Sequence, residues 1–341
     1  MKFGIFDHLD IRDEPLAKTY DERLKLLHLA DQAGFHAYHL AEHHGTPLGA
    51  APSPSVFLSA VARETTRIRL GPMVFLLPLY HPLRLIEEIC ILDNLSKGRL
   101  ELGVGRGISP IEIGFFGVEP DATHTLFREA LEVILKGLSS ERLNHEGEHF
   151  RFDNVPMALR PVQTPHPPVW AGVGGQQSQE FAAEIGMNMM VNGPTSRIKS
   201  LVENVGKLWP ERKNRPDLPK SPISSPFLGG ARQIYLADTD READETCREA
   251  YDDWYLKLVK LWREHNMEAG FASIFLTYEQ AKDAGLIYVG TPDTVRARMA
   301  DEITETGANY LLLQFAFGNL GHERESRSMR LFIDHVMPAL V

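Results

Sequence analysis

Residues 99–107, Arg-Leu-Glu-Leu-Gly-Val-Gly-Arg-Gly, join a strand pattern directly to a glycine turn. Apolar residues fill every second position of the first half, which predicts a β-strand. Gly105 and Gly107 then flank one cation, Arg106. Because glycine has no side chain, a flat ligand can approach the backbone there, and the arginine fork suits a phosphate. The stretch predicts the floor of a site for a planar, phosphorylated cofactor; a tight turn with a surface arginine is the alternative.

Strand and helix patterns alternate along the whole chain, outward from this stretch. Strands are expected at residues 2–6, 35–41, 68–77, 99–107, 168–173, 187–191, 229–237 and 310–317. Helical periodicity is expected at residues 20–33, 54–65, 82–95, 123–138, 178–185, 195–208, 240–264, 290–305 and 322–336. Eight such units predict an α/β fold, a (β/α)8 TIM barrel with insertions, in a single domain over residues 1–341. An open doubly wound sheet is the alternative, but no GxGxxG follows the first strand.

Three segments interrupt the alternation. Residues 139–167 are expected to form a loop, and residues 209–227, with five prolines, an excursion from the barrel. Residues 265–288 show no clean period and are expected to form a mobile loop.

The composition is that of a globular protein, with 43% hydrophobic and 24% charged residues among 341. The net charge of −10 without a basic run argues against nucleic acid as a partner. The two cysteines, Cys90 and Cys247, lie far apart in the sequence, with neither a CxxC pair nor the cysteine pattern of a disulfide framework. Neither a signal-peptide pattern nor a membrane-length apolar run is found, so a cytoplasmic protein without membrane contact is expected.

Polar residues follow the first two strands, where an eight-stranded barrel has its active site. These residues are Asp7 and His8, then Glu42, His43 and His44. Successive strand residues point to opposite faces, so adjacent histidines seldom share a metal ion, and no metal site is predicted. We expect a histidine that acts as acid, base or hydrogen-bond donor; the alternative is a loop cap beside a packed side chain.

A second glycine turn follows the fifth strand. Gly174 and Gly175 precede a helix whose first turn contains Ser178. Free amides at a helix start bind anions, and Arg106 is predicted to lie on the neighbouring strand, so a phosphate could be held between the two turns. A helix cap without a ligand is the alternative.

The chain resembles the bacterial luciferase-like monooxygenases almost from end to end. The resemblance rests on Lys2-Phe3-Gly4, Ala33-Gly34-Phe35, Leu40-Ala41-Glu42-His43-His44, Leu77-Pro78, His81-Pro82, Leu92-Asp93-Asn94-Leu95-Ser96-Lys97-Gly98-Arg99, Gly103-Val104-Gly105-Arg106-Gly107, Phe116-Gly117, Ala182-Ala183-Glu184, Val289-Gly290-Thr291-Pro292 and Val336-Met337-Pro338. The segment from residue 81 to residue 107 is its most specific part.

The resemblance implies a (β/α)8 barrel that binds reduced FMN at its mouth, with molecular oxygen as co-substrate. It places His43 near the flavin as a catalytic residue, with Glu42 beside it. It also places Met73 and Val74 where the family often has a non-prolyl cis peptide bond under the flavin ring. Gly105 matches a cysteine of luciferase itself.

The resemblance assigns the phosphate pocket to Arg106, Gly174, Gly175 and Ser178. The chain departs from the luciferase pattern here, because luciferase has Glu-Ser at the two glycines. An arginine that is common in the family, in the helix after the fourth strand, is His124 or Leu126 here, depending on the alignment. Light emission is not predicted.

The function implied is a monooxygenase acting on a small apolar or amphipathic molecule, with a separate flavin reductase and a homodimeric assembly. Aromatic side chains expected near the substrate are Phe6, Phe75, Phe115 and Phe317, although phenylalanine is more often core. The alternatives are a dehydrogenase that uses the deazaflavin F420, a flavin-binding protein without catalysis, and a metal-dependent hydrolase.

Overall fold

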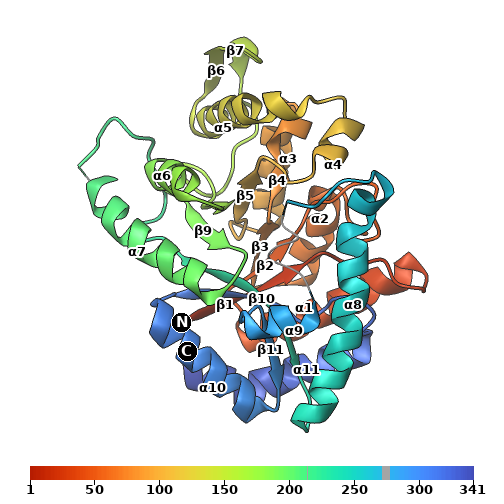
Figure 1. Ribbon diagram of the computed structural model, residues 1–341. Coiled ribbons are helices and arrows are strands. Elements are labelled where there is room, and N and C mark those ends of the chain that lie inside the picture. Colours follow the sequence, from red (N-terminus) through yellow and green to blue (C-terminus); the bar gives the residue numbers. More distant parts are fainter. Residues whose placement is uncertain (213, 271–276) are drawn as a thin grey trace.

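The computed structural model describes residues 1–212, 214–270 and 277–341. A parallel sheet at its centre is surrounded by helices (Figure 1). The sheet contains β1 (Lys2–Asp7), β2 (Ala37–Leu40), β3 (Arg69–Pro72), β4 (Phe75–Leu76), β5 (Leu102–Gly105), β8 (Val169–Gly172), β9 (Asn188–Val191), β10 (Leu228–Leu236), β11 (Ile287–Gly290) and β12 (Tyr310–Gln314).

The sheet closes on itself as a barrel. Its order is β3-β2-β1-β12-β10-β9-β8-β5-β4, and β11 pairs with β10 beside this path. β3 and β4 are consecutive pieces of one strand, and Leu70 bridges Leu100 just before β5, which joins the two ends of the order. Eight strand positions therefore form the ring, and the predicted (β/α)8 barrel is confirmed.

Proline and glycine mark several helix ends as predicted, but α1 begins four residues before the expected position, and α4, α9 and α12 are not among the predicted helices. Proline occupies the first turn of α2, α3 and α10, and a left-handed glycine ends α1, α6 and α10. The helices are α1 (Leu16–Ala33), α2 (Pro54–Glu64), α3 (Pro82–Leu95), α4 (Pro110–Phe115), α5 (Thr123–Ser139), α6 (Gln176–Ile185), α7 (Thr195–Arg212), α8 (Asp240–Glu264), α9 (Tyr278–Asp283), α10 (Pro292–Thr306), α11 (His322–His335) and α12 (Met337–Leu340), with short 3₁₀ turns at η1 (Leu77–Leu79) and η2 (Pro120–Ala122).

Side chains fill the barrel interior on the side of the strand N-termini. Trp170, Met190, Tyr310 and Leu312 form one buried cluster there. Gly4 makes room for it, because a Cβ at this position would lie 2.0 Å from the Tyr310 hydroxyl oxygen. The packed interior leaves the carboxyl ends of the strands as the open end of the barrel.

The expectation of a loop over residues 139–167 is wrong in part. β6 (Arg142–Glu146) and β7 (Arg151–Pro156) pair as an antiparallel hairpin that stands away from the barrel beyond α5 (Figure 1). Each of the two strands has only one buried residue, Leu143 in β6 and Phe152 in β7. This hydrophobic pattern is too sparse to predict the strands from the sequence.

The other two irregular segments are partly structured. α7 runs three residues into the 209–227 segment beyond Trp209, and the described residues 214–227 contain neither helix nor strand. The 265–288 segment includes α9 and the start of β11, while residues 271–276 lie outside the described residues. None of the described helices is both long and apolar enough to cross a membrane.

Candidate active site

The sequence-predicted residues lie along one arc of the barrel rim. β1, β2, β3–β4, β5 and β8 are successive neighbours in the ring, and parallel strands all end on the same face. His8 follows β1, His43 follows β2, Val74 precedes β4, Gly105 ends β5 and Gly172 ends β8. Residues separated by up to 164 positions in the sequence thus meet at one edge of the sheet.

The two glycine turns are neighbours across a strand pair. Val104 lies opposite Ala171 in the β5–β8 ladder, one residue before each turn begins. A Cβ built on Gly172, Gly174 or Gly175 would meet nothing within 4 Å, so the backbone of the second turn borders open space. The space needed for a group that approaches the backbone closely is therefore present.

The amides of the second turn are held by a serine cap. The N–H groups of Gly174 and Gly175 each donate to Ser178 Oγ at 3.1 Å, and this hydroxyl donates to the Gly175 carbonyl at 2.7 Å. Arg106, at the first turn, is exposed, and its side chain makes no hydrogen bond or ion pair with the described part of the chain. The helix cap is thus present, beside an exposed cation.

Val74 packs directly against the first turn. The Met73–Val74 peptide bond is cis, as the family resemblance implies. A Cβ at Gly105 would lie 2.3 Å from Val74 Cγ2, so the volume of a side chain at position 105 is already taken by Val74. Glycine is required at position 105 by this close approach.

Glu112, a residue that the sequence reasoning missed, is the partner of His43. Its carboxylate lies 3.2 Å from His43 Nδ1 and accepts the His44 backbone N–H at 2.8 Å. Ser109 caps α4 by accepting the Glu112 N–H at 3.3 Å, which orients the first turn. The Ser-Pro-x-Glu pattern after the glycine turn signals this helix start, but the contact with His43 spans 69 residues and has no local signal.

Glu42 points elsewhere. Its carboxylate accepts from the Leu76 N–H at 3.2 Å and the Tyr80 hydroxyl at 2.9 Å, and lies 2.9 Å from His44 Nε2. These contacts tie the end of β2 to β4 and η1. A catalytic role for Glu42 stays a prediction.

Charge and burial separate the two site histidines. Burial alone would lower the pKa of His43, but the Glu112 carboxylate, with Glu42 and Asp10, raises it above the usual value. Burial lowers the pKa of His8 well below the usual value, and nearby His43 adds to this effect. The site therefore pairs one imidazole whose surroundings favour the charged form, His43, with one whose surroundings favour the neutral form, His8.

The four phenylalanines expected near the substrate divide into two pairs. Phe75 and Phe317 are fully buried in the hydrophobic core, so the expectation of substrate contact is wrong for them. Phe6 is half-buried against the His8 ring, and Phe115 is 52% exposed on α4. The described residues contain no group of three or more metal-ligating side chains placed to hold an ion.

The sequence pattern that defines the luciferase-like monooxygenases matches residues 1–310. The chain belongs to this family. Its members are flavin-dependent monooxygenases, so this luciferase-like chain is an enzyme of that class.

Two relatives and one solved structure give the range of the similarity. An uncharacterised protein of Sinorhizobium fredii is 41% identical over 94% of this chain and 92% of its own length. The oxygenase component of the flavin-dependent trigonelline monooxygenase of Acinetobacter baylyi is 27% identical, covering 99% and 95%. The oxygenating constituent of the 3,6-diketocamphane monooxygenase of Pseudomonas putida, solved with FMN, is 22% identical with a TM-score of 0.81, covering 100% and 99%; this likeness concerns the fold.

Proposed function

We propose that this luciferase-like chain is the oxygenase component of a two-component monooxygenase. It would use reduced FMN, delivered by a separate flavin reductase, and molecular oxygen to oxidise a small apolar or amphipathic molecule. The observation that carries the proposal is the arc of adjacent strand ends, with two glycine turns at one end and His43 at the other. The FMN complex of the diketocamphane enzyme supports the choice of cofactor.

Residues at the two turns fit the phosphate end of FMN. The N–H groups of Gly174 and Gly175 would donate to phosphate oxygens, either in place of the Ser178 hydroxyl or in addition to it. Arg106 would supply the positive charge. The flat ring would lie toward the Met73–Val74 segment, whose Val74 side chain fills the space beside Gly105. Bound reduced FMN supplies the electrons that activate oxygen.

His43 would hold a proton at the other end of the arc. Its Nδ1 faces Glu112, so Nε2 is the nitrogen left for the reacting groups. The carboxylate favours the charged form of the ring and fixes its orientation, as a positioning residue does for a histidine acid. His43 is therefore assigned to proton donation, and Glu112 to holding it in place.

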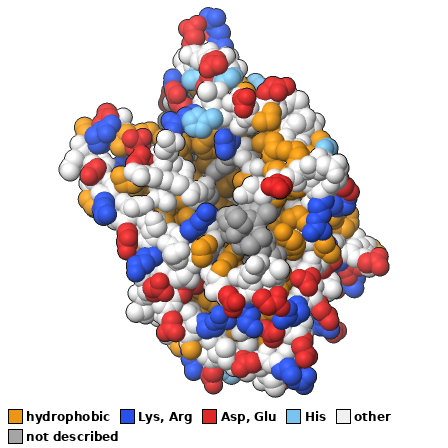
Figure 2. Space-filling view, viewed as in Figure 1, with side chains coloured by type: hydrophobic (Ala, Val, Ile, Leu, Met, Phe, Trp, Pro, Cys, Tyr) orange, Lys and Arg blue, Asp and Glu red, His pale blue; other side chains and the backbone are white. Residues whose placement is uncertain are grey.

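The apolar character of the substrate is inferred from the side chains around the mouth. On the face seen in Figure 2, the surface is hollowed near its centre and hydrophobic side chains gather around the hollow. Ile108 is 65% exposed and Phe116 is 49% exposed at the ends of α4, beside the Glu112 side of the site. Contiguous exposed apolar patches mark ligand or partner surfaces, and Ile108, Phe115 and Phe116 expose apolar side chains along and beside this one short helix.

We also propose that the chain forms a homodimer through α2 and α3. These helices contact each other on the outside of the barrel and expose Val56 and Ile91. Apolar side chains on two adjacent helices favour an isologous contact with a second copy.

A flavin titration of the Arg106→Ala variant tests the cofactor site. FMN should bind about 10–100-fold more weakly, because a charge-assisted bond to phosphate contributes roughly 1.5–3 kcal/mol. Riboflavin, which lacks the phosphate, should keep its affinity. Arg151→Ala, which removes another exposed arginine, on the β6–β7 hairpin, is the control and should change neither.

Three results would contradict the proposal. An equal loss for FMN and riboflavin would remove Arg106 from the phosphate site. Tighter binding of F420 than of FMN, with hydride transfer and no oxygen uptake, would favour the dehydrogenase. Flavin binding without oxygen uptake by the reduced complex would favour a carrier protein.

A further inference from the structure

His8 is a buried polar residue that the proposed function does not yet use. His8 comes directly after β1, and Leu9 beside it has a left-handed backbone with φ of 57°, so the chain turns at this point. The His8 ring lies 4.7 Å from the Phe6 ring, 5.5 Å from the His43 ring and 6.0 Å from the Trp254 ring, centroid to centroid. It is 6% exposed. His8 thus lies beside the proposed proton donor, in an aromatic surround.

The neighbours of His8 fix which ring nitrogen carries the hydrogen. The Trp254 indole N–H, which can only donate, points to His8 Nδ1 at 3.4 Å, and the Gln314 amide nitrogen lies 3.0 Å from the same atom. A nitrogen that accepts these bonds carries no hydrogen. In the neutral ring the hydrogen is therefore on Nε2, and protonating Nδ1 would oppose two donors.

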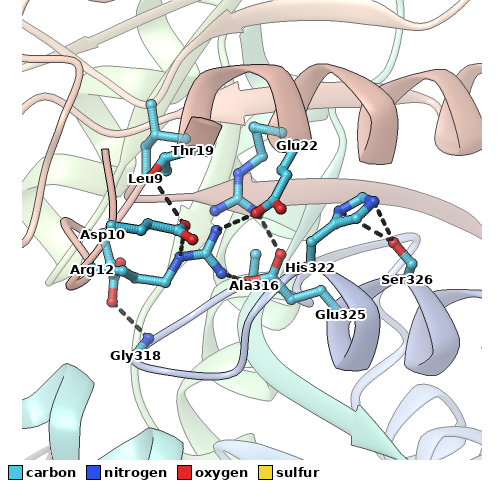
Figure 3. A network of polar contacts seen from close by, with 12 residues as sticks. Leu9, Asp10, Arg12, Thr19, Glu22, Ala316, Gly318, His322, Glu325 and Ser326 are labelled. Carbon is cyan, nitrogen blue, oxygen red and sulfur yellow. Dashed lines mark hydrogen bonds and ion pairs between the residues drawn. The ribbon is translucent and has the colours of Figure 1, made fainter. Parts of the chain in front are cut away.

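Two hydrogen bonds fix the backbone around His8, one within its own loop and one to the segment between β12 and α11. The Leu9 N–H donates to Asp7 Oδ1 at 2.8 Å, and the Gly318 N–H donates to Asp10 Oδ2 at 2.7 Å. Figure 3 shows the network that joins this loop, through Asp10, to the segment after β12. The backbone on both sides of His8 is therefore fixed. A side chain that orients a ligand needs such a rigid support.

Arg12 extends this support to the last long helix. It donates to Glu325 of α11 at 2.8 Å, within the same network (Figure 3). The segment from β1 to α1 is thereby anchored to α11 as well as to the loop after β12.

We propose that the Nε2–H of His8 is the hydrogen-bond donor that orients the substrate, and that it selects an uncharged molecule with a carbonyl or hydroxyl oxygen on an apolar body. This inference rests on the proposed function and names the substrate class of the same site. A fixed neutral donor fits a neutral oxygen, and the half-buried Phe6 ring fits the apolar body beside it. The carboxylates of Glu42 and Glu112 lie near His43 and disfavour a substrate anion.

Charge and tautomer give the two histidines different tasks. His43, paired with Glu112, holds the mobile proton, whereas His8 donates a hydrogen bond without giving up its hydrogen. Burial and the nearby His43 both lower the pKa of His8, which agrees with this division. Groups pushed apart in this way mark the separate roles of neighbouring titratable residues.

The first test is the ring state of His8, by ¹⁵N NMR of the full chain labelled at histidine, with and without FMN. The His8 signals are assigned by their loss in His8→Gln. We expect the neutral Nε2–H form from about pH 6 to pH 8. A cationic ring at pH 7, or the Nδ1–H form, would overturn the proposal whether or not FMN binds, which separates its failure from that of the proposed function.

The second test compares two probes of matched shape, cyclohexanone and methylenecyclohexane. The ketone should shift the His8 Nε2–H signal and bind about tenfold more tightly than the hydrocarbon, the ratio that one good hydrogen bond provides. In His8→Leu this ratio should fall below about twofold, and in His8→Gln, which keeps an N–H donor, part of it should return. Equal binding of the two probes by the unmodified chain would overturn the proposal, even if His8→Leu failed to fold.

Discussion

Gly105 and Val74 share one small volume at the rim of the barrel. A Cβ at position 105 would lie 2.3 Å from Val74 Cγ2, and a valine has little rotamer freedom to move away. We expect Gly105→Ala to lower the free energy of unfolding by about 1–3 kcal/mol, the usual cost of an overpacked site. Urea unfolding of the flavin-free chain measures this without any contribution from cofactor binding.

The double variant Val74→Ala/Gly105→Ala is the control for this pair. Removing the valine methyl groups makes room for the new Cβ, so Gly105→Ala should cost less than about 0.5 kcal/mol in the Val74→Ala background. An equal cost of Gly105→Ala in both backgrounds would mean that the contact with Val74 does not explain the glycine.

At the scale of elements, α4 places a carboxylate on the end of β2. Replacing Glu112 by Gln removes the negative charge that lies beside the His43 ring but leaves the ring buried. The pKa of His43 should therefore fall below its usual value, so that the acid form is lost at lower pH than in the unmodified chain. A ¹⁵N NMR titration of His43 measures this change in pKa. The fall in rate at high pH, where the acid loses its proton, should move to lower pH by the same amount.

His44→Asn is the control for the Glu112 prediction. It removes the neighbouring ring and keeps the His43–Glu112 contact, so the His43 titration should move little. If Glu112→Gln left the titration of His43 in place, Glu112 would have a structural role only.

The elements of the barrel could be predicted from the sequence, whereas the contacts between distant elements could not. The eight barrel strands show dense apolar runs or alternation, and glycine and proline mark the helix ends. Leu143 and Phe152 are the only buried residues of β6 and β7. One buried residue in each strand is too weak a hydrophobic pattern to predict the hairpin. The predicted neighbours of His43 included Glu42, which lies next to it in the chain, but the carboxylate that reaches its ring comes from Glu112 on α4.

At the scale of the whole molecule, the rim arc is complete within one copy of the chain. The two glycine turns, the Met73–Val74 bond and His43 all come from strands of the same barrel. The proposed dimer surface on α2 and α3 lies on the outer wall. Assembly and flavin binding should therefore be separable by mutation.

The double variant Val56→Glu/Ile91→Glu tests this separation. The unmodified chain should sediment at twice the chain mass of 38.3 kDa, and the variant at the mass of one chain, because four buried carboxylates would face each other across an isologous contact. Val341→Glu is the matched control, since this residue is 71% exposed, about as much as Val56, but lies at the C-terminus. FMN affinity should be the same in all three proteins. A single-chain mass for the unmodified protein would exclude the dimer, and a loss of FMN binding by the monomeric variant would show that the site needs the second copy.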